Sequence, residues 1–292
     1  MDAQKCEALI TTLELGSMTA AAEQLGYSQS GITRMIGALE EEVGFPLVIR
    51  NKKGIRLTEN GSAMLPLFRQ IVRSENDARQ KSADILGSCA GYLTIGSYYS
   101  ISAMWMPGIL KEFLRLYPGV KVKVREGGNR DMAHWLSEKS VDMCFCAEQS
   151  REICEWTPLF EDEISVWLPK DHPKCAAGSF PLPEIDREPF IHIQPGEDTE
   201  IDRILSQNGL HPEVCFTTRD AYSAWHLVAA GLGISFNQKL ISKGWNADVV
   251  TLPFDPPQYV SLGMAVPVDS RLSPAASRFA ELAKSKIQNC EV

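Results

Sequence analysis

The sequence lacks any apolar run of about 18 residues, the length that a membrane-spanning helix needs. It also lacks an apolar signal core at its start, because residues 1–15 include Asp2, Glu7 and Glu14. We therefore expect a cytoplasmic protein that makes no membrane contact. Since 44% of its 292 residues are hydrophobic, the chain is not a disordered one, and its length allows two or three domains.

Signatures of catalysis and metal binding are missing as well. The eight cysteines show no zinc spacing: one residue separates Cys144 from Cys146, and no second pair follows. Both lie in the apolar run 141–147, where a free cysteine usually serves as a small buried side chain, with a metal or redox role as the alternative. The five histidines are scattered, with no nucleophile elbow or phosphate loop beside them. We expect no cofactor and no enzymatic activity.

The net charge of −8 argues against a surface that binds nucleic acid everywhere, but it permits a local basic patch. Four bases fall within seven residues that contain no acid: Arg50, Lys52, Lys53 and Arg56. Gly54 among them predicts the tip of a hairpin. Such a hairpin would bind DNA phosphates as a wing. Residues 1–58 as a whole are not basic, because they contain six basic and seven acidic side chains.

The residues before this hairpin predict three short helices. Glycines are placed to end the first two, and Ser17 and Ser28 to cap the second and third. The third helix, residues 29–43, carries polar side chains opposite its apolar face, near its start: Gln29, Ser30, Thr33 and Arg34. Such side chains can reach base edges in the major groove, which predicts a recognition helix. A solvated face on an ordinary helix is the alternative.

Two runs carry a family resemblance: SMTAAAEQLGYSQS at 17–30, and Leu39-Glu40, Val43-Gly44, Pro46-Leu47, Arg50 and Leu57-Thr58-Glu59 at 39–59. At these spacings, residues 1–65 resemble the winged helix-turn-helix of LysR-type transcription regulators. The sequence departs from the family at Ser30-Gly31, where Pro-Ala is common. The resemblance implies double-stranded DNA as a partner and these contact residues: Ser17, Thr19, Ser28, Gln29, Ser30, Thr33, Arg34, Arg50, Lys52, Lys53 and Arg56.

Residues 59–88 predict one long helix with a thin apolar stripe that includes Leu65, Phe68 and Val72. A helix of about 25 residues is about 40 Å long, and such a stripe needs a partner. In the LysR family these helices pair between subunits, which implies a homodimer or homotetramer and a pseudo-palindromic operator. Packing against the chain's own sensor region is the alternative.

From Gly91 onward strands and helices alternate, and all six tryptophans appear. Strands expected at 92–96, 120–124 and 141–147, with helices between them, predict a parallel sheet. Ligands bind such sheets at the carboxyl ends of strands and at helix N-termini, which nominates Ser100, Ser102 and Asn129. Helix capping without a ligand explains the serines equally well.

This region also resembles the LysR family, at Gly91-Tyr92-Leu93, Tyr117-Pro118 and the run LVAAGLGI at 227–234. The resemblance implies an α/β sensor of two Rossmann-like lobes, like a periplasmic binding protein, after an all-α winged helix-turn-helix and a long linker helix. The implied domains are a DNA-binding domain at 1–58, a linker at 59–88, lobe I at 89–162 and 266–292, and lobe II at 163–265. The implied cleft residues are Ser100, Ser102, Phe145, Gln194 and Thr218.

These features predict a sequence-specific DNA-binding regulator controlled by a small-molecule effector between two sensor lobes. Because serines at a helix N-terminus suit a carboxylate, an organic acid or an aromatic compound is the expected effector. A thiol-based redox regulator of the same architecture is the alternative, through Cys175 and Cys215, which lie 40 residues apart. A free-standing solute-binding protein is opposed by the first 90 residues.

Overall fold

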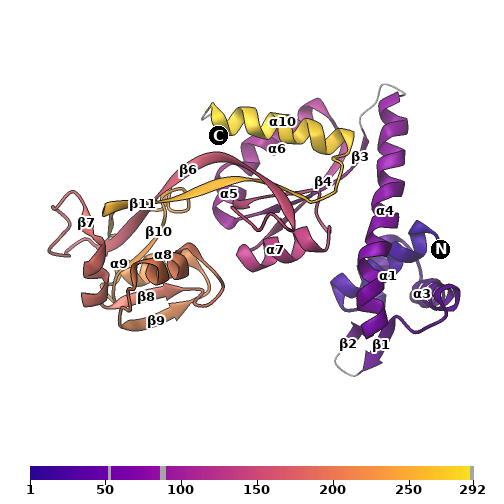
Figure 1. Cartoon of the computed structure of the whole chain (residues 1–292), viewed down its shortest axis with the longest axis horizontal. Coiled ribbons are helices and arrows are strands. Elements are labelled where there is room, and N and C mark those ends of the chain that lie inside the picture. The colour runs from indigo at the N-terminus through magenta and orange to yellow at the C-terminus, as the bar shows by residue number, and fades with distance from the viewer. Residues whose placement is uncertain (52–53, 86–89, 290–292) are drawn as a thin grey trace.

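The computed structural model describes residues 1–51, 54–85 and 90–289, so Lys52 and Lys53 lie outside the described residues. Three parts follow one another along the molecule (Figure 1): a helical domain with a long helix, a central α/β lobe and a second α/β lobe. The predicted fold class is therefore confirmed. Within these ranges, no helix combines the length and the apolar character that a membrane crossing requires.

The helical domain is built on the predicted helix caps. It contains α1 (Ala3–Leu15), α2 (Met18–Leu25) and α3 (Gln29–Val43). Ser17 and Ser28 cap α2 and α3, because their hydroxyls accept hydrogen bonds from the backbone N–H groups of Ala20 (3.3 Å) and Gly31 (3.0 Å). The apolar faces of the helices then meet in one core, which includes Leu9, Ile32, Ile36, Leu39, Leu47 and Phe68.

Two short strands form the predicted wing. They are β1 (Val48–Asn51) and β2 (Gly54–Leu57), paired antiparallel. Glu40 of α3 holds the chain that leads into β1, because its Oε1 accepts hydrogen bonds from the N–H groups of Leu47 (2.7 Å) and Val48 (3.1 Å). This carboxylate therefore has a structural role inside the domain.

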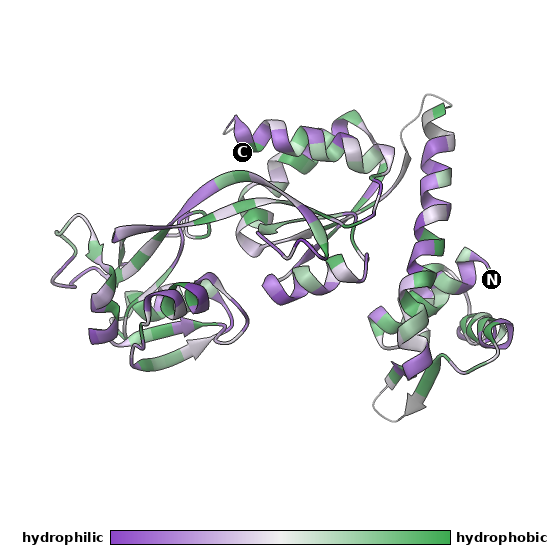
Figure 2. Cartoon of the chain, in the orientation of Figure 1, coloured by the Kyte–Doolittle hydropathy of each residue, from purple (hydrophilic) through white to green (hydrophobic). Residues whose placement is uncertain are grey.

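The long helix α4 (Glu59–Ile85) contacts both of its neighbours. Its first half contributes Leu65 and Phe68 to buried positions, and Phe68 belongs to the core of the helical domain. Its second half is largely hydrophilic (Figure 2) and lies against the central lobe. There the Gln80 amide donates a hydrogen bond to the Tyr92 carbonyl (2.9 Å) and accepts one from the Ala275 N–H (3.4 Å). Within one chain, the second half of the helix therefore packs on the central lobe, and its pairing between subunits stays a prediction.

Charge pairs add to the contact between the helical part and the central lobe. Arg73 of α4 lies 3.2 Å from the carboxylate of Asp142, measured from Nη2 to Oδ1. Arg69 reaches Glu138 at 3.1 Å, again on the central lobe. These pairs, with the Gln80 hydrogen bonds, connect the central lobe directly to the helix that contributes Phe68 to the core of the helical domain.

The central lobe, called lobe I here, contains the predicted parallel sheet. Strand β3 (Ala90–Ser97) lies between β4 (Gly119–Glu126) and β5 (Met143–Ala147) and runs parallel to both. The helices of this lobe are α5 (Tyr99–Met104), α6 (Met106–Leu116), α7 (Asn129–Ser137) and α10 (Pro274–Gln288). Because the strands are parallel, the segments that follow β3 and β4 emerge at one edge of the sheet.

Two long antiparallel strands connect lobe I to the second lobe, lobe II. They are β6 (Cys154–Pro169) and β11 (Val249–Pro267) (Figure 1). β11 pairs with β5 in lobe I, and β6 pairs with β10 (Ser235–Gln238) in lobe II. The rest of lobe II comprises β7 (Phe180–Pro181), the 3-10 helix Leu182–Arg187, β8 (Phe190–Ile193), α8 (Glu200–Asn208), β9 (Val214–Thr218) and α9 (Ala221–Ala229). Lobes joined by a pair of extended strands can hinge about them.

Asp162 is buried on β6, and we predict that it makes the stability of the fold depend on pH. Burial raises the pKa of its carboxyl from 3.8 to about 6, although the N–H of Leu240 donates a hydrogen bond to it (3.0 Å). The unfolded chain releases this proton near its ordinary pKa, whereas the folded chain keeps it to about 6, so stability is lost as the pH rises through that range.

The free energy of unfolding of the wild type should therefore fall relative to that of Asp162→Asn by about 2 kcal/mol between about pH 4.5 and about pH 8. Urea unfolding followed by tryptophan fluorescence measures this difference, since all six tryptophans follow Gly91. A difference that stays constant across this range would show that Asp162 ionises normally.

Candidate functional site

The first half of α3 presents the predicted polar face to solvent. Gln29, Ser30 and Arg34 are exposed, whereas Thr33 is half-buried and its hydroxyl lies 3.3 Å from the sulfur of Met18. The side chains of Gln29, Ser30 and Arg34 are therefore accessible to a partner, whereas Thr33 packs against α2. The placement fits a helix that offers its N-terminal turns to a DNA groove.

Ser17, Thr19 and Ser28 lie at the starts of α2 and α3. The hydroxyls of both serines are already used as capping acceptors, and Ser28 Oγ also lies 3.0 Å from Ser30 Oγ. Thr19 is exposed. A serine that caps a helix through its oxygen keeps its own proton for a phosphate, so capping and DNA contact are compatible.

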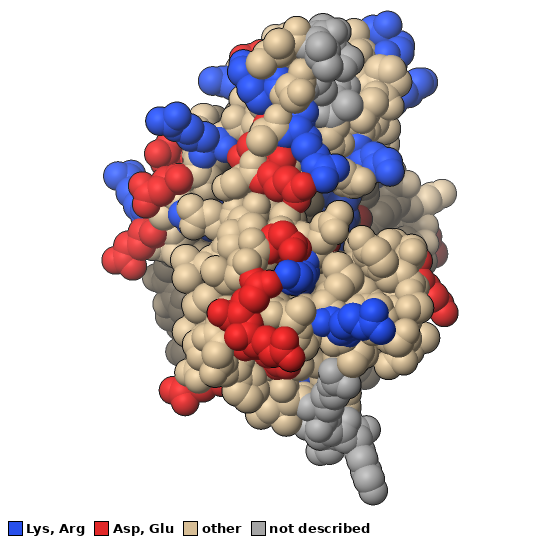
Figure 3. Space-filling view, turned by 90° about the vertical axis from the view of Figure 1, so that its right-hand side faces the viewer, with Lys and Arg blue, Asp and Glu red and all other residues tan. Residues whose placement is uncertain are grey.

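The wing offers one basic side chain that can be placed. Arg56 on β2 is exposed, and Arg50 pairs with Ile55 in the backbone ladder. The side chain of Arg50, together with Lys52 and Lys53, lies outside the described residues. Acidic and basic side chains are interspersed on the face shown in Figure 3, so no surface of one sign covers it. Any DNA contact on this face would therefore rely on the local placement of charge.

A second candidate site is a cavity of about 440 Å³ between the two lobes. Lobe I contributes the segments that follow β3 and β4, and lobe II contributes the starts of α8 and α9 with parts of the chain after β8 and β10. Its apolar wall includes Tyr99, Met104, Ile193, Ile201, Tyr222 and Trp245. A mostly apolar cavity with a few polar groups is typical of a small-molecule site.

A hydrogen-bond network crosses the floor of this cavity. The Tyr98 hydroxyl and the Gln149 amide both donate to Asn129 Oδ1, the latter at 3.1 Å. Asn129 in turn donates to the Asp198 carbonyl of lobe II, and the Ser100 hydroxyl donates to Gln238 (3.0 Å), also in lobe II. Burial raises the pKa of Tyr98 well above its ordinary value, so this hydroxyl keeps its proton.

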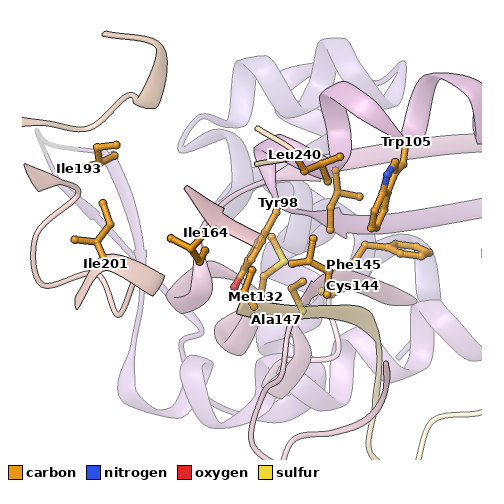
Figure 4. Close-up of a cluster of buried hydrophobic side chains, with 14 of the residues drawn as sticks. Tyr98, Trp105, Met132, Cys144, Phe145, Ala147, Ile164, Ile193, Ile201 and Leu240 are labelled. Atoms are coloured by element: carbon orange, nitrogen blue, oxygen red, sulfur yellow. The ribbon is translucent and has the colours of Figure 1, made fainter. Parts of the chain in front are cut away.

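Half of the predicted effector residues line the cavity: Ser100, Asn129 and Gln194. The other half are not in the lining, which corrects the prediction. Phe145 is fully buried in the core of lobe I, where its ring packs edge-to-face on Phe279 (6.1 Å between centroids), and Figure 4 shows it among other buried side chains. Ser102 is half-buried on α5 and is not in the lining, although Ser100 and Ala103 on either side of it are.

Thr218 does not line the cavity, but it contacts two residues that do. Its carbonyl accepts a hydrogen bond from the Gln194 N–H (2.7 Å), and its hydroxyl accepts one from the Asp220 N–H (3.1 Å). Both of these partners line the cavity. Thr218 therefore positions lining residues without joining them.

Sequence reasoning missed most of the lobe II wall, including Glu200, Tyr222 and Trp245. Glu200 is the first residue of α8, its Oε1 is buried, and within the described residues this oxygen has no hydrogen-bond partner. Burial raises the pKa of this carboxyl. A buried carboxylate oxygen without a hydrogen-bond partner is costly, which marks Glu200 as a candidate ligand contact.

Four of the six cysteines in the described part of the chain are unsuited to redox chemistry. Cys6, Cys144, Cys146 and Cys154 are buried, and burial raises the pKa of each thiol, that of Cys6 to about 11. A raised pKa lowers the fraction of reactive thiolate. Cys215 is exposed and Cys175 half-buried, and both are free.

Comparison with known proteins agrees with this architecture. The family described as "LysR substrate binding domain" matches residues 87–288, and "Bacterial regulatory helix-turn-helix protein, lysR family" matches residues 4–62. The uncharacterized HTH-type transcriptional regulator YvbU of Bacillus subtilis (strain 168) is 28% identical over 289 residues, which cover 97% of this chain and 98% of that protein. The HTH-type transcriptional regulator cbl of Klebsiella aerogenes is 27% identical over 240 residues, 80% of this chain and 76% of that protein.

Solved structures share the fold over nearly the whole chain. A full-length OxyR from Pseudomonas aeruginosa gives a TM-score of 0.73 at 21% identity, covering 99% of this chain and 98% of that one. Full-length CbnR in complex with its target DNA gives 0.65 at 20% identity, covering 98% and 99%. At such identities the likeness concerns the fold alone.

Proposed function

We propose, from the premise that the chain belongs to the LysR family of transcription regulators, that it binds a specific DNA sequence under the control of a small molecule held between its two lobes. The observation that carries this proposal is the combination, in one chain, of an exposed polar recognition-helix start and an interlobe cavity lined by both lobes. In this proposal residues 1–58 bind DNA, residues 59–88 join subunits, and lobe I (89–162 and 266–292) and lobe II (163–265) bind the effector, without catalysis.

The DNA-binding part of the proposal rests on α3 and the wing. Gln29, Ser30 and Arg34 would read base edges, and Arg56 would contact phosphate beside them. A relative of the same fold, CbnR, has been crystallised with its target DNA, which supports DNA as the partner here. A homodimer or homotetramer would present two copies of α3, so the operator would be pseudo-palindromic.

Pairing of α4 helices between subunits is the proposed basis of the dimer. Leu67 and Ile85 are 52% and 76% exposed on this helix, which leaves apolar surface for a partner after the helix has packed on its own chain. The packing of α4 on lobe I, through Gln80 and Arg73, would carry a change in the lobes to the DNA-binding domains.

Arg56→Ala tests the wing. If Arg56 contacts a phosphate, this change should weaken binding evenly across DNA sequences and reduce the slope of log affinity against log salt concentration by about one unit. Fluorescence anisotropy at several salt concentrations measures the slope. Lys111→Ala, an exposed base on α6, is the matched control and should leave the slope unchanged. An unchanged slope for Arg56→Ala would remove this part of the wing from the interface.

A thermal-shift screen of small organic acids and aromatic compounds, followed by DNA-binding measurements with each hit, tests the effector part. We expect a compound that stabilises the protein and changes its affinity for DNA. If oxidants change DNA binding and no compound does, the thiol-based alternative replaces the small-molecule one, and Cys215 is the first thiol to substitute.

A further inference from the structure

The charged groups around the interlobe cavity are unfavourable for an anion. Resting on the function proposed above, we propose that the effector is an apolar or aromatic molecule with a cationic amine at one end, and that this amine binds Glu200. An organic acid, the class expected from serines at a helix start, is disfavoured by the same groups.

Carboxylates already stand at three of the four helix starts that border the cavity, those of α7, α8 and α9, whereas the start of the short helix α5 has no side-chain cap. Asp131 accepts a hydrogen bond from the Gly128 N–H at α7 (3.0 Å), and Asp202 accepts one from the Thr199 N–H at α8 (3.0 Å). Asp220 accepts hydrogen bonds at α9 from two backbone N–H groups, the closer at 2.8 Å. Helix starts attract anions, but here the protein's own carboxylates occupy that role and would repel a second anion.

Glu200 adds a carboxylate of which one oxygen has no hydrogen-bond partner within the described residues. This oxygen, Oε1, is buried in the cavity wall. The nearby Tyr98 hydroxyl donates its proton to Asn129. An N–H donor on a ligand would supply the missing partner, and a charged donor makes the stronger hydrogen bond.

The cation on the same helix neutralises Glu200 only in part, because it is shared with another carboxylate. Arg203 binds Asp198 with two nitrogens, Nε at 3.1 Å and Nη2 at 2.7 Å. Arg219 is the basic residue of the cavity lining, and it is exposed to solvent. Because solvent screens an exposed charge more than a buried one, Arg219 would offset the charge of an ionised Glu200 only in part.

The apolar wall fits the rest of such a ligand. The rings of Tyr222 and Trp245 meet at 82° with centroids 5.2 Å apart, and the Tyr99 ring belongs to the same lining. Ile193 and Ile201 extend this surface in lobe II. Aromatic rings pack against an apolar or aromatic body, and their faces also attract a cationic amine.

Three probes with the same ring and spacer separate charge from shape: 2-phenylethylamine, 2-phenylethanol and 3-phenylpropanoate. Calorimetric titration of the full chain at neutral pH should give binding of the amine about tenfold tighter than that of the alcohol, and weakest binding of the acid. In Glu200→Gln, the affinity for the amine should fall by about tenfold, to about that of the alcohol, and the affinity for the alcohol should stay unchanged. Glu213→Gln, an exposed carboxylate outside the lining, is the matched control and should change nothing.

The variant should remain folded, because Gln removes a charge whose burial is unfavourable, and its melting temperature should equal or exceed that of the wild type. Tighter binding of the acid than of the amine, an amine preference that survives in Glu200→Gln, or no binding of the amine would each overturn the inference. DNA binding by the same preparation, measured without any probe, is independent of these outcomes. Its absence would count against the proposed function, whereas failure of the amine with DNA binding intact counts against the ligand class alone.

Discussion

Arg34→Ala is expected to weaken binding to the protein's own operator by about tenfold or more, while binding to unrelated DNA changes much less. Arg34 is exposed on the second turn of α3, where a guanidinium can form two hydrogen bonds to a guanine edge. Its loss should therefore relax discrimination at one base position in each half-site. Fluorescence anisotropy with the operator and with single-base variants measures both effects.

Arg115→Ala is the matched control for this experiment, since Arg115 is an exposed arginine on α6 of the sensor. It should leave affinity and base preference unchanged. Equal losses on all DNA sequences for Arg34→Ala would instead identify Arg34 as a phosphate contact.

Phe68→Ala should destabilise the DNA-binding domain by about 3–5 kcal/mol, since it empties a site that is fully buried between α4 and the helices of that domain. Tryptophan fluorescence reports only on the sensor, because all six tryptophans follow Gly91. Circular dichroism reports on both parts, so a separate early transition should appear there and not in the fluorescence.

Leu15→Ala is the control for Phe68→Ala, because Leu15 at the end of α1 is 42% exposed and its truncation should cost little. If fluorescence and circular dichroism shift together in Phe68→Ala, the two parts unfold as one unit and α4 couples them more tightly than its contacts imply. Either result measures how strongly the linker joins sensor and DNA-binding domain.

Local patterns in the sequence predicted the DNA-binding end well. The caps Ser17 and Ser28 and the exposed residues Gln29 and Arg34 depend on neighbours within a few positions, so helical spacing is enough to place them. The parallel order of β3, β4 and β5 likewise follows from alternating strands and helices.

The cavity could be predicted only in part, because its wall is assembled from distant segments. Ser100 and Asn129 follow strands of the sheet, and that position alone identified them. Tyr222 and Trp245 come together through the folding of lobe II, which no periodicity records. Phe145 shows the opposite error: its place at the end of a strand suggested the cleft, but its side chain points into the core.

The same limit applies to the linker. Its apolar stripe was predicted correctly at Leu65 and Phe68, but the sequence left open whether the helix packs within the chain or between subunits. Within one chain, Gln80 forms hydrogen bonds to two segments of lobe I that lie far away in sequence, whereas pairing between subunits stays a prediction. A polar residue in a long helix carries no local signal of such a partner.

Selection of DNA from a random-sequence library by the purified full-length chain tests the central claim most directly. The account predicts that repeated selection converges on one pseudo-palindromic sequence, and that Arg34→Ala selects sequences in which one base of each half-site is no longer fixed. A library that stays random after selection, with binding that depends on salt alone, would contradict it.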